Sequence, residues 1–111
     1  MADKWQALRD HQAGVAGRAI LSLFDQPDRA AQFSVHAGAM LLDYSKTNID
    51  AKALELLREL AQASGVADKR AAMFGGQPIN DTEGRAVLHT ALRAPKGAAV
   101  MVDGANVVPA I

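Results

Sequence analysis

The first third of the chain changes from helical to extended spacing of its apolar residues. A capping carboxylate at Asp3, with Gln6 three residues on, predicts a helix whose apolar face carries Trp5 and Leu8. Glycines 14 and 17 are expected to weaken that helix past His11. Grouped apolar residues predict a second helical segment over residues 18–24, which Pro27 is expected to end, and residues 28–32 could form one further turn.

The middle of the chain contains the two clearest patterns. Alternating residues over 33–37 and an apolar run over 40–44, separated by a glycine, predict a β-hairpin. Asn48 or Asp50 then opens an amphipathic helix that Gly65 is expected to end. Its apolar positions recur at helical spacing: Ala53, Leu54, Leu57, Leu60 and Ala61.

Two further helices are predicted after residue 67. Residues 68–74 form a short helix that Gly75-Gly76 ends. Asn80 stands three residues before Glu83, which is the spacing of a capping box, so a second helix is expected from there to Pro95. The apolar stripe of this second helix comprises Val87, Leu88, Ala91 and Leu92.

The C-terminal residues predict a strand and leave the last element open. Residues 98–102 are continuously apolar, as in a buried strand, and Asp103-Gly104 is a turn sequence. Residues 105–111 either return as a second strand, or Asn106 caps a helix with Pro109 in its first turn. In both cases the chain stops partway into an element, which indicates a truncated polypeptide.

The composition indicates a small globular segment with a thin core. Half of the 111 residues are hydrophobic, but alanine dominates and only 5% are aromatic, so the segment is expected to complete its core against other chain. Twelve basic and twelve acidic residues balance and are scattered, which argues against a nucleic-acid partner. Without cysteine, an N-terminal signal pattern or an apolar run of membrane-spanning length, a cytoplasmic location is expected and no membrane.

Three acidic residues are the candidates for a catalytic carboxylate, and each has a simpler interpretation. Glu55 and Glu59 lie on the polar face of the predicted amphipathic helix, where a solvated role is expected. Glu83 lies at a predicted helix N-terminus, where a carboxylate favours the free amides and the helix dipole.

The other chemically capable residues also favour structural roles. The three histidines are too far apart in sequence to show a metal-ligand spacing: His11, His36 and His89. Gly75-Gly76 precedes a predicted helix, but no lysine–serine/threonine pair follows, so a turn is favoured over a phosphate loop. Arg85 and Arg93 are expected on one helix face, either pairing with acids of a neighbouring subdomain or solvated. Trp5 and Phe24 are expected to anchor the N-terminal helices to a core.

Three blocks of the sequence resemble the phosphoglucose isomerase family. The first joins Phe33-Ser34 to the run 42–46, LDYSK, which is similar to the family's hairpin ending in a DYSK motif. The second block runs from Met73 to Arg93 and contains the most specific match, TEGRAVLH over residues 82–89. The third contains Val102-Asp103-Gly104 and then Val108-Pro109. One departure is an extra residue, Thr47, between the DYSK motif and Asn48, which affects a loop and a helix entry.

The resemblance implies an α/β enzyme of two sugar-isomerase subdomains, of which residues 1–111 are the mainly helical N-terminal segment, with one or two short hairpins. Such an enzyme interconverts glucose 6-phosphate and fructose 6-phosphate through a cis-enediol, uses a glutamate base, needs no metal or redox cofactor and is usually a homodimer. The family's catalytic motifs match no position in 1–111, so no catalytic, cofactor-binding or metal-binding residue is predicted here, and the chain alone is expected to be inactive. The alternative is a stand-alone helical interaction or assembly module without catalysis.

Overall fold

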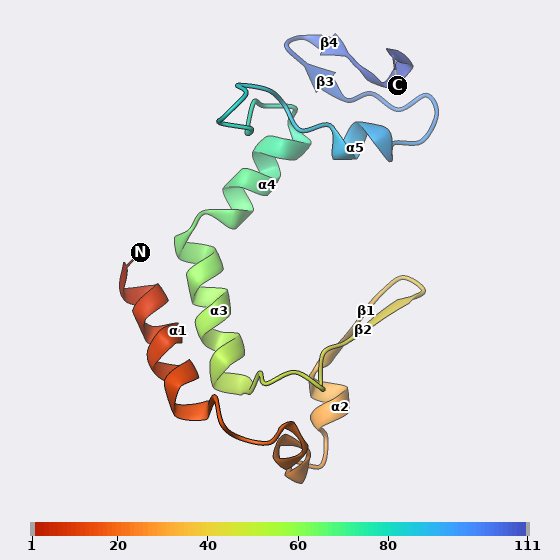
Figure 1. Cartoon of the computed structure of the whole chain (residues 1–111). Coiled ribbons are helices and arrows are strands. Elements are labelled where there is room, and N and C mark those ends of the chain that lie inside the picture. Colours follow the sequence, from red (N-terminus) through yellow and green to blue (C-terminus); the bar gives the residue numbers. More distant parts are fainter. Residues whose placement is uncertain (1, 111) are drawn as a thin grey trace. The chain divides into compact units, whose positions relative to one another are not determined.

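The computed structural model describes residues 2–110 and divides into two compact units, residues 1–63 and 64–111 (Figure 1). The structure is mainly helical, with two small antiparallel strand pairs, as expected for this segment. None of the helices within residues 2–110 combines the length and the apolar character needed to cross a bilayer.

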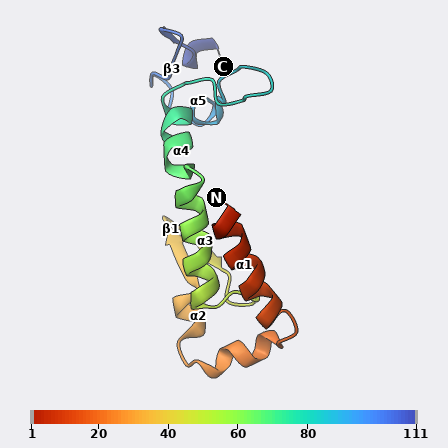
Figure 2. The ribbon, with the colours of Figure 1, turned by 90° about the vertical axis from the view of Figure 1, so that its left-hand side faces the viewer.

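Two antiparallel helices form the centre of the first unit. Helix α1 (Ala2–Val15) and helix α3 (Ala51–Ala63) lie side by side in both views (Figures 1 and 2). Helix α1 continues through Gly14 to Val15, so the expected weakening does not end it at His11. Trp5, expected in a core, is 50% exposed.

The buried face of α3 differs by one position from the predicted face. Ala53, Leu56 and Leu60 are buried, whereas Leu57, which was predicted on the apolar face, is 39% exposed. The prediction that Leu57 lies on the buried face was wrong because Leu56 and Leu57 both continue a helical spacing from Ala53. Packing in the folded unit, and not the spacing itself, decides which of the two is covered.

The segment between these helices contains a short 3₁₀ helix, a helical turn and the hairpin. The 3₁₀ helix η1 (Ile20–Asp25) and α2 (Arg29–Gln32) occupy the two predicted helical segments. Strands β1 (Ser34–Ala37) and β2 (Met40–Asp43) pair antiparallel, with Val35 opposite Leu42. Gly38 has a φ of +59° at the first position of the two-residue turn, which suits a type II′ hairpin turn and favours glycine there.

The second unit begins with a helix and continues mostly in turns. Gly65, with a left-handed φ of +71°, follows α3 as predicted and directly precedes α4 (Val66–Phe74). The rest comprises α5 (His89–Leu92), β3 (Met101–Val102), β4 (Ala105–Asn106) and the 3₁₀ helix η2 (Val108–Ala110).

The predicted helix from Asn80 to the residues before Pro95 is wrong over most of its length. The Asn80 side chain does accept the Glu83 amide at 3.3 Å, as in a capping box. However, Gly84 turns the chain with a φ of +64°, and the Asn80 amide donates to the Arg85 carbonyl at 3.0 Å, which closes a tight turn. Only α5 is helical, because the capping contacts start a turn that the left-handed glycine ends.

The C-terminal residues combine both alternatives left open by the sequence. β3 and β4 form a hairpin through Asp103 and Gly104, whose φ values of 51° and 79° are both positive, as in a type I′ turn. The η2 turn then follows, and the Asn106 side chain accepts the Val108 amide at 3.2 Å. The paired strand is shorter than residues 98–102, and Ile111 lies outside the described residues.

Candidate functional site

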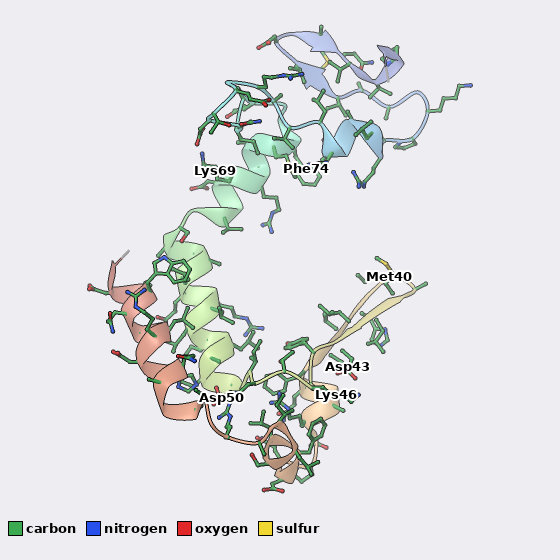
Figure 3. The ribbon with its side chains drawn as sticks, viewed as in Figure 1. Met40, Asp43, Lys46, Asp50, Lys69 and Phe74 are labelled. Carbon is green, nitrogen blue, oxygen red and sulfur yellow. The ribbon has the colours of Figure 1, made fainter. Side chains whose placement is uncertain are left out.

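The most connected polar cluster in the first unit surrounds Asp50, directly before α3 (Figure 3). Arg18 donates from Nη1 to Asp50 Oδ2 at 2.8 Å and from Nε to Asn48 Oδ1 at 2.6 Å. His11 of α1 lies with Nε2 2.9 Å from Asp50 Oδ1. The Ala53 amide donates to the same carboxylate oxygen at 2.7 Å, so Asp50 caps α3 as predicted.

The electrostatics of this cluster make Asp50 a poor acid or base. Partial burial raises the pKa of the Asp50 carboxyl, but hydrogen bonds from the Ala53 amide, Arg18 and His11 lower it far more. The pKa therefore lies well below the ordinary range for aspartate, and the group stays ionised near neutral pH. A carboxylate whose two oxygens are engaged in this way fixes helix α1, the following loop and α3 together.

A second cluster surrounds Arg29, which is only 3% exposed. Its guanidinium carbon lies 4.1 Å from the Phe33 ring centroid, and Phe24 is 5.8 Å away. Nε donates to the Ser45 carbonyl and Nη2 to the Thr47 carbonyl, each at 2.9 Å. The arginine thus fixes the loop that follows the hairpin. Its contact with Phe24 agrees with the predicted packing role of that phenylalanine.

The residues of the DYSK motif belong to the same loop. The Ser45 amide donates to Asp43 Oδ1 at 2.9 Å, and hydrogen bonds from Ser45 are the main cause of the lowered pKa of Asp43. Tyr44 packs edge-on against Phe33 with ring centroids 5.5 Å apart, and Ser45 is 1% exposed. The motif therefore forms a hydrogen-bonded turn at the foot of the hairpin.

The three carboxylates weighed as catalysts each have a hydrogen-bond partner of their own. Glu59 accepts from Lys4 of α1 at 2.7 Å, and Glu55 accepts from Lys52 of its own helix at 3.0 Å. Glu83 lies in the turn of the second unit, where it accepts from Asn80 Nδ2 at 3.3 Å. Glu55 and Glu59 lie one turn apart on α3 and both interact with Lys52, whereas Glu83 belongs to the second unit. Glu59 is the exception to a purely solvated role, because its partner comes from another helix.

The histidines are equally separate. His11 joins the Asp50 cluster, while His36 on β1 and His89 at the start of α5 are exposed. Within residues 2–110, no three side chains of His, Cys, Asp or Glu come together in a group suited to a metal ion.

The glycine pair after α4 ends the helix, and its amides are occupied. The amides of Gly75, Gly76 and Gln77 donate to carbonyls of α4 at 2.9, 3.2 and 3.0 Å. A phosphate loop needs such amides to point at the anion, so this geometry favours the predicted turn. Gly76 also has a second role, since a Cβ placed there would lie 2.0 Å from the Met101 carbonyl oxygen. Only glycine permits this close approach of the two backbones.

A shallow cavity of about 350 Å³ lies in the second unit beside Gly76. Arg85, Leu88 and Asp103 line part of it. Arg85 is solvent-exposed, lies 3.7 Å from Glu83 and does not share a helix with Arg93, so the predicted common helix face of the two arginines is wrong. Arg93 instead donates to the His89 carbonyl at 3.1 Å.

Sequence reasoning did not find the Arg18–Asp50 and Arg29 clusters. Arg18 and Asp50 are 32 residues apart, and Arg29 reaches carbonyls 16 and 18 residues further on. No spacing rule joins such positions. The only available signal was the capping character of Asp50.

Comparison with known proteins gives the class of the chain. Residues 43–111 match the family described as phosphoglucose isomerase. A glucose-6-phosphate isomerase of Roseobacter denitrificans is 59% identical over 111 residues, which is all of this chain and 21% of that protein. One from Cereibacter sphaeroides is 58% identical over 111 residues, which is again all of this chain and 21% of that protein. One from Deinococcus radiodurans is 52% identical over 108 residues, 96% of this chain and 20% of that protein.

The chain therefore belongs to the phosphoglucose isomerase family. It spans about a fifth of the length of the curated relatives that it matches. The resemblance drawn from the sequence, to the N-terminal part of this family's enzymes, is confirmed.

Proposed function

We propose that these residues are the N-terminal part of a glucose-6-phosphate isomerase, which interconverts glucose 6-phosphate and fructose 6-phosphate in glycolysis and gluconeogenesis. One observation carries the proposal: relatives with that name match this chain over its whole length at 59% and 58% identity. The reaction moves a proton between adjacent carbons through a cis-enediol, with a glutamate as the base and without a metal or redox cofactor.

In this proposal residues 1–111 supply scaffold, and no catalytic residue lies among them. The support is that the polar groups described above already have hydrogen-bond or ion-pair partners. Asp50 is bonded by Arg18, His11 and a backbone amide, while the carboxylates of Glu55 and Glu59 each contact a lysine. An isomerase needs a free carboxylate within about 3 Å of the transferred proton, together with donors for the sugar phosphate.

The proposal extends to the complete enzyme. We infer two α/β sugar-isomerase subdomains following this segment, a homodimer, a sugar phosphate substrate and a cytoplasmic location. The thin core supports the need for further chain, since the buried hydrophobic residues within 2–110 are few: Phe33, Ala53, Leu56, Leu60 and Ala91.

The test joins this chain to the remainder of the Roseobacter denitrificans relative, in place of its matched 111 residues. Conversion of fructose 6-phosphate to glucose 6-phosphate is measured for the chimera and for the 111-residue chain alone. Activity in the chimera and none in the chain alone is the expected result. An inactive but folded chimera would overturn the proposed function, and turnover by the chain alone would place a catalytic site within it.

The alternative of a stand-alone interaction module makes a different expectation. A module that functions by itself should unfold in one cooperative thermal transition. The proposed N-terminal part should lack that transition when alone and gain it in the chimera. Differential scanning calorimetry of both proteins distinguishes the two.

A further inference from the structure

The β1–β2 hairpin has one face that is entirely apolar. Residues opposite each other in an antiparallel pair lie on the same face, as do residues two apart along a strand. With Val35 opposite Leu42 and Ala37 opposite Met40, these four side chains share one face. Val35, Met40 and Leu42 are 51%, 72% and 61% exposed, so the described residues leave this face largely uncovered.

The opposite face is mostly polar. It carries Ser34, His36, Leu41 and Asp43. The Ser34 hydroxyl donates to the Ala30 carbonyl at 2.6 Å, and Asp43 accepts the Ser45 amide at 2.9 Å. The hairpin is therefore amphipathic, with the polar groups at its foot already bonded within the first unit.

The foot of the hairpin is firmly held, although the strands themselves are not covered. The Tyr44 amide donates to the Phe33 carbonyl at 2.9 Å, which extends the ladder by one step. Phe33 is buried between Tyr44 and Arg29, 5.5 and 4.1 Å away by ring and guanidinium distances. Met40, by contrast, lies near the free end of the hairpin (Figure 3). A two-stranded hairpin is only marginally stable in water, so an ordered one needs packing on its apolar face.

The hairpin differs from the single exposed apolar residues of the same unit. On η1 only Ile20 and Leu21 are exposed large apolar residues, and small groups of this kind are normal on protein surfaces. Four contiguous apolar side chains on one sheet face instead mark a contact surface. No lysine or arginine lies within residues 34–43, which argues against a lipid surface as the partner.

We propose that the face formed by Val35, Ala37, Met40 and Leu42 is covered by the part of the isomerase polypeptide that lies outside these 111 residues. This inference rests on the proposed function. The matched relatives hold about four fifths of their length outside the match, which provides ample apolar chain to cover it. A second copy of the hairpin fits less well, because stable dimers use roughly 20–30 residues on each side and this face offers four.

The test exploits two neighbouring leucines on opposite faces. Leu42→Ser removes an apolar side chain from the proposed contact, and Leu41→Ser is the matched control in the same strand, at 57% against 61% exposure. Both changes are made in the Roseobacter chimera. Amide hydrogen exchange of residues 34–43 is measured in each variant and in the unmodified chimera.

In the unmodified chimera we expect the hairpin amides to exchange at least about 10-fold more slowly than in the 111-residue chain alone. Leu42→Ser should abolish that difference, and Leu41→Ser should keep it. Equal effects of the two changes, or no slowing in the chimera, would overturn the inference. Hairpin-dependent dimerisation of the 111-residue chain, seen by sedimentation and lost in Leu42→Ser, would overturn it in favour of a second copy.

The readout separates this inference from the proposed function. Slowed exchange that depends on Leu42, in a chimera without isomerase activity, would support the contact and contradict the function. An active chimera whose hairpin amides exchange as fast as in the 111-residue chain would support the function and contradict the contact.

Discussion

The two units of the chain are stabilised in different ways. In residues 2–63, side chains far apart in sequence bind each other: Lys4 contacts Glu59 across 55 residues, and Arg18 contacts Asp50 across 32. In residues 64–110, neighbouring residues form turns, as in the Asn80–Glu83 contacts and the Arg93–His89 bond. The difference shows that the first unit depends on particular side chains and the second on backbone geometry at its glycines.

The largest effect is expected where the second unit depends on a single backbone approach. Gly76→Ala would place a Cβ 2.0 Å from the Met101 carbonyl oxygen, at a φ of +73°. We expect a loss of about 3 kcal/mol or more, since strain and a backbone clash act together. Hydrogen exchange of residues 98–106 would detect it as lost protection.

Gly84→Ala is the control for that change. It has a similar φ of +64°, but nothing lies within 4 Å of the added Cβ, so only the backbone strain of about 1 kcal/mol remains. Equal effects at the two glycines would show that the Met101 contact is unimportant.

The next effect tests whether the first unit depends on its buried arginine. Arg29→Ala removes both donors to the Ser45 and Thr47 carbonyls and the stacking on Phe33. A loss of about 3 kcal/mol is expected, because the carbonyls lose their partners and a cavity forms. Urea unfolding of the Roseobacter chimera, which is expected to unfold cooperatively, measures it. The exposed Arg58→Ala should change the free energy of unfolding by less than about 0.5 kcal/mol.

A smaller, pH-dependent effect is expected at Asp50. The folded-state pKa of this carboxyl lies below its unfolded value of about 3.9, so its contribution is present above that pH and is lost as the pH falls toward the folded pKa. Asp50→Asn should cost about 1–2 kcal/mol at pH 7 and reduce the acid dependence of stability. Unfolding of the chimera measured from pH 7 down to about pH 2 tests this.

The exposed Asp28→Asn is the matched control for Asp50→Asn, because its side chain makes no capping bond. It should leave stability at pH 7 unchanged. If the two variants respond alike to acid, the contacts of Arg18 and His11 with Asp50 do not set the pH dependence.

The smallest effect is a stabilisation in α1. Gly14 is helical, and a Cβ there meets nothing within 4 Å. Gly14→Ala should raise the free energy of unfolding by about 0.5–1 kcal/mol through helix propensity. Gly38→Ala in the hairpin turn, at a φ of +59°, should lower it. A stabilising Gly38→Ala would contradict the turn geometry.

The sequence predicted those elements whose signals are local. The hairpin, the Asp50 cap and the ends set by Gly65 and Gly75 all follow from neighbouring residues. The prediction of a helix from Asn80 was wrong because the capping contacts are followed by a left-handed glycine, Gly84. The spacing rule takes account of the capping contacts and not of the glycine. Leu56 and Leu57 have nearly equal helical spacing, so only packing could decide between them.

The candidate site was less predictable than the fold. Glu55 was placed correctly on the polar face of a helix, which needed no knowledge of a partner element. Glu83 keeps its expected contacts with Asn80, but it lies in a turn and not at the predicted helix N-terminus. Arg18 and Arg29 gave no signal, because their acceptors are distant carboxylate and carbonyl oxygens. The role of a side chain that depends on tertiary contacts cannot be predicted from the local sequence pattern.

Asp50 couples a local event to a distant one. Its carboxylate receives the Ala53 amide, which starts α3, and also the Arg18 guanidinium from beyond α1. Nucleation of α3 and docking of the segment after α1 therefore stabilise each other, and the first turn of α3 cannot fray independently. The exchange rate of one amide, that of Ala53, should consequently report the folding cooperativity of the whole first unit.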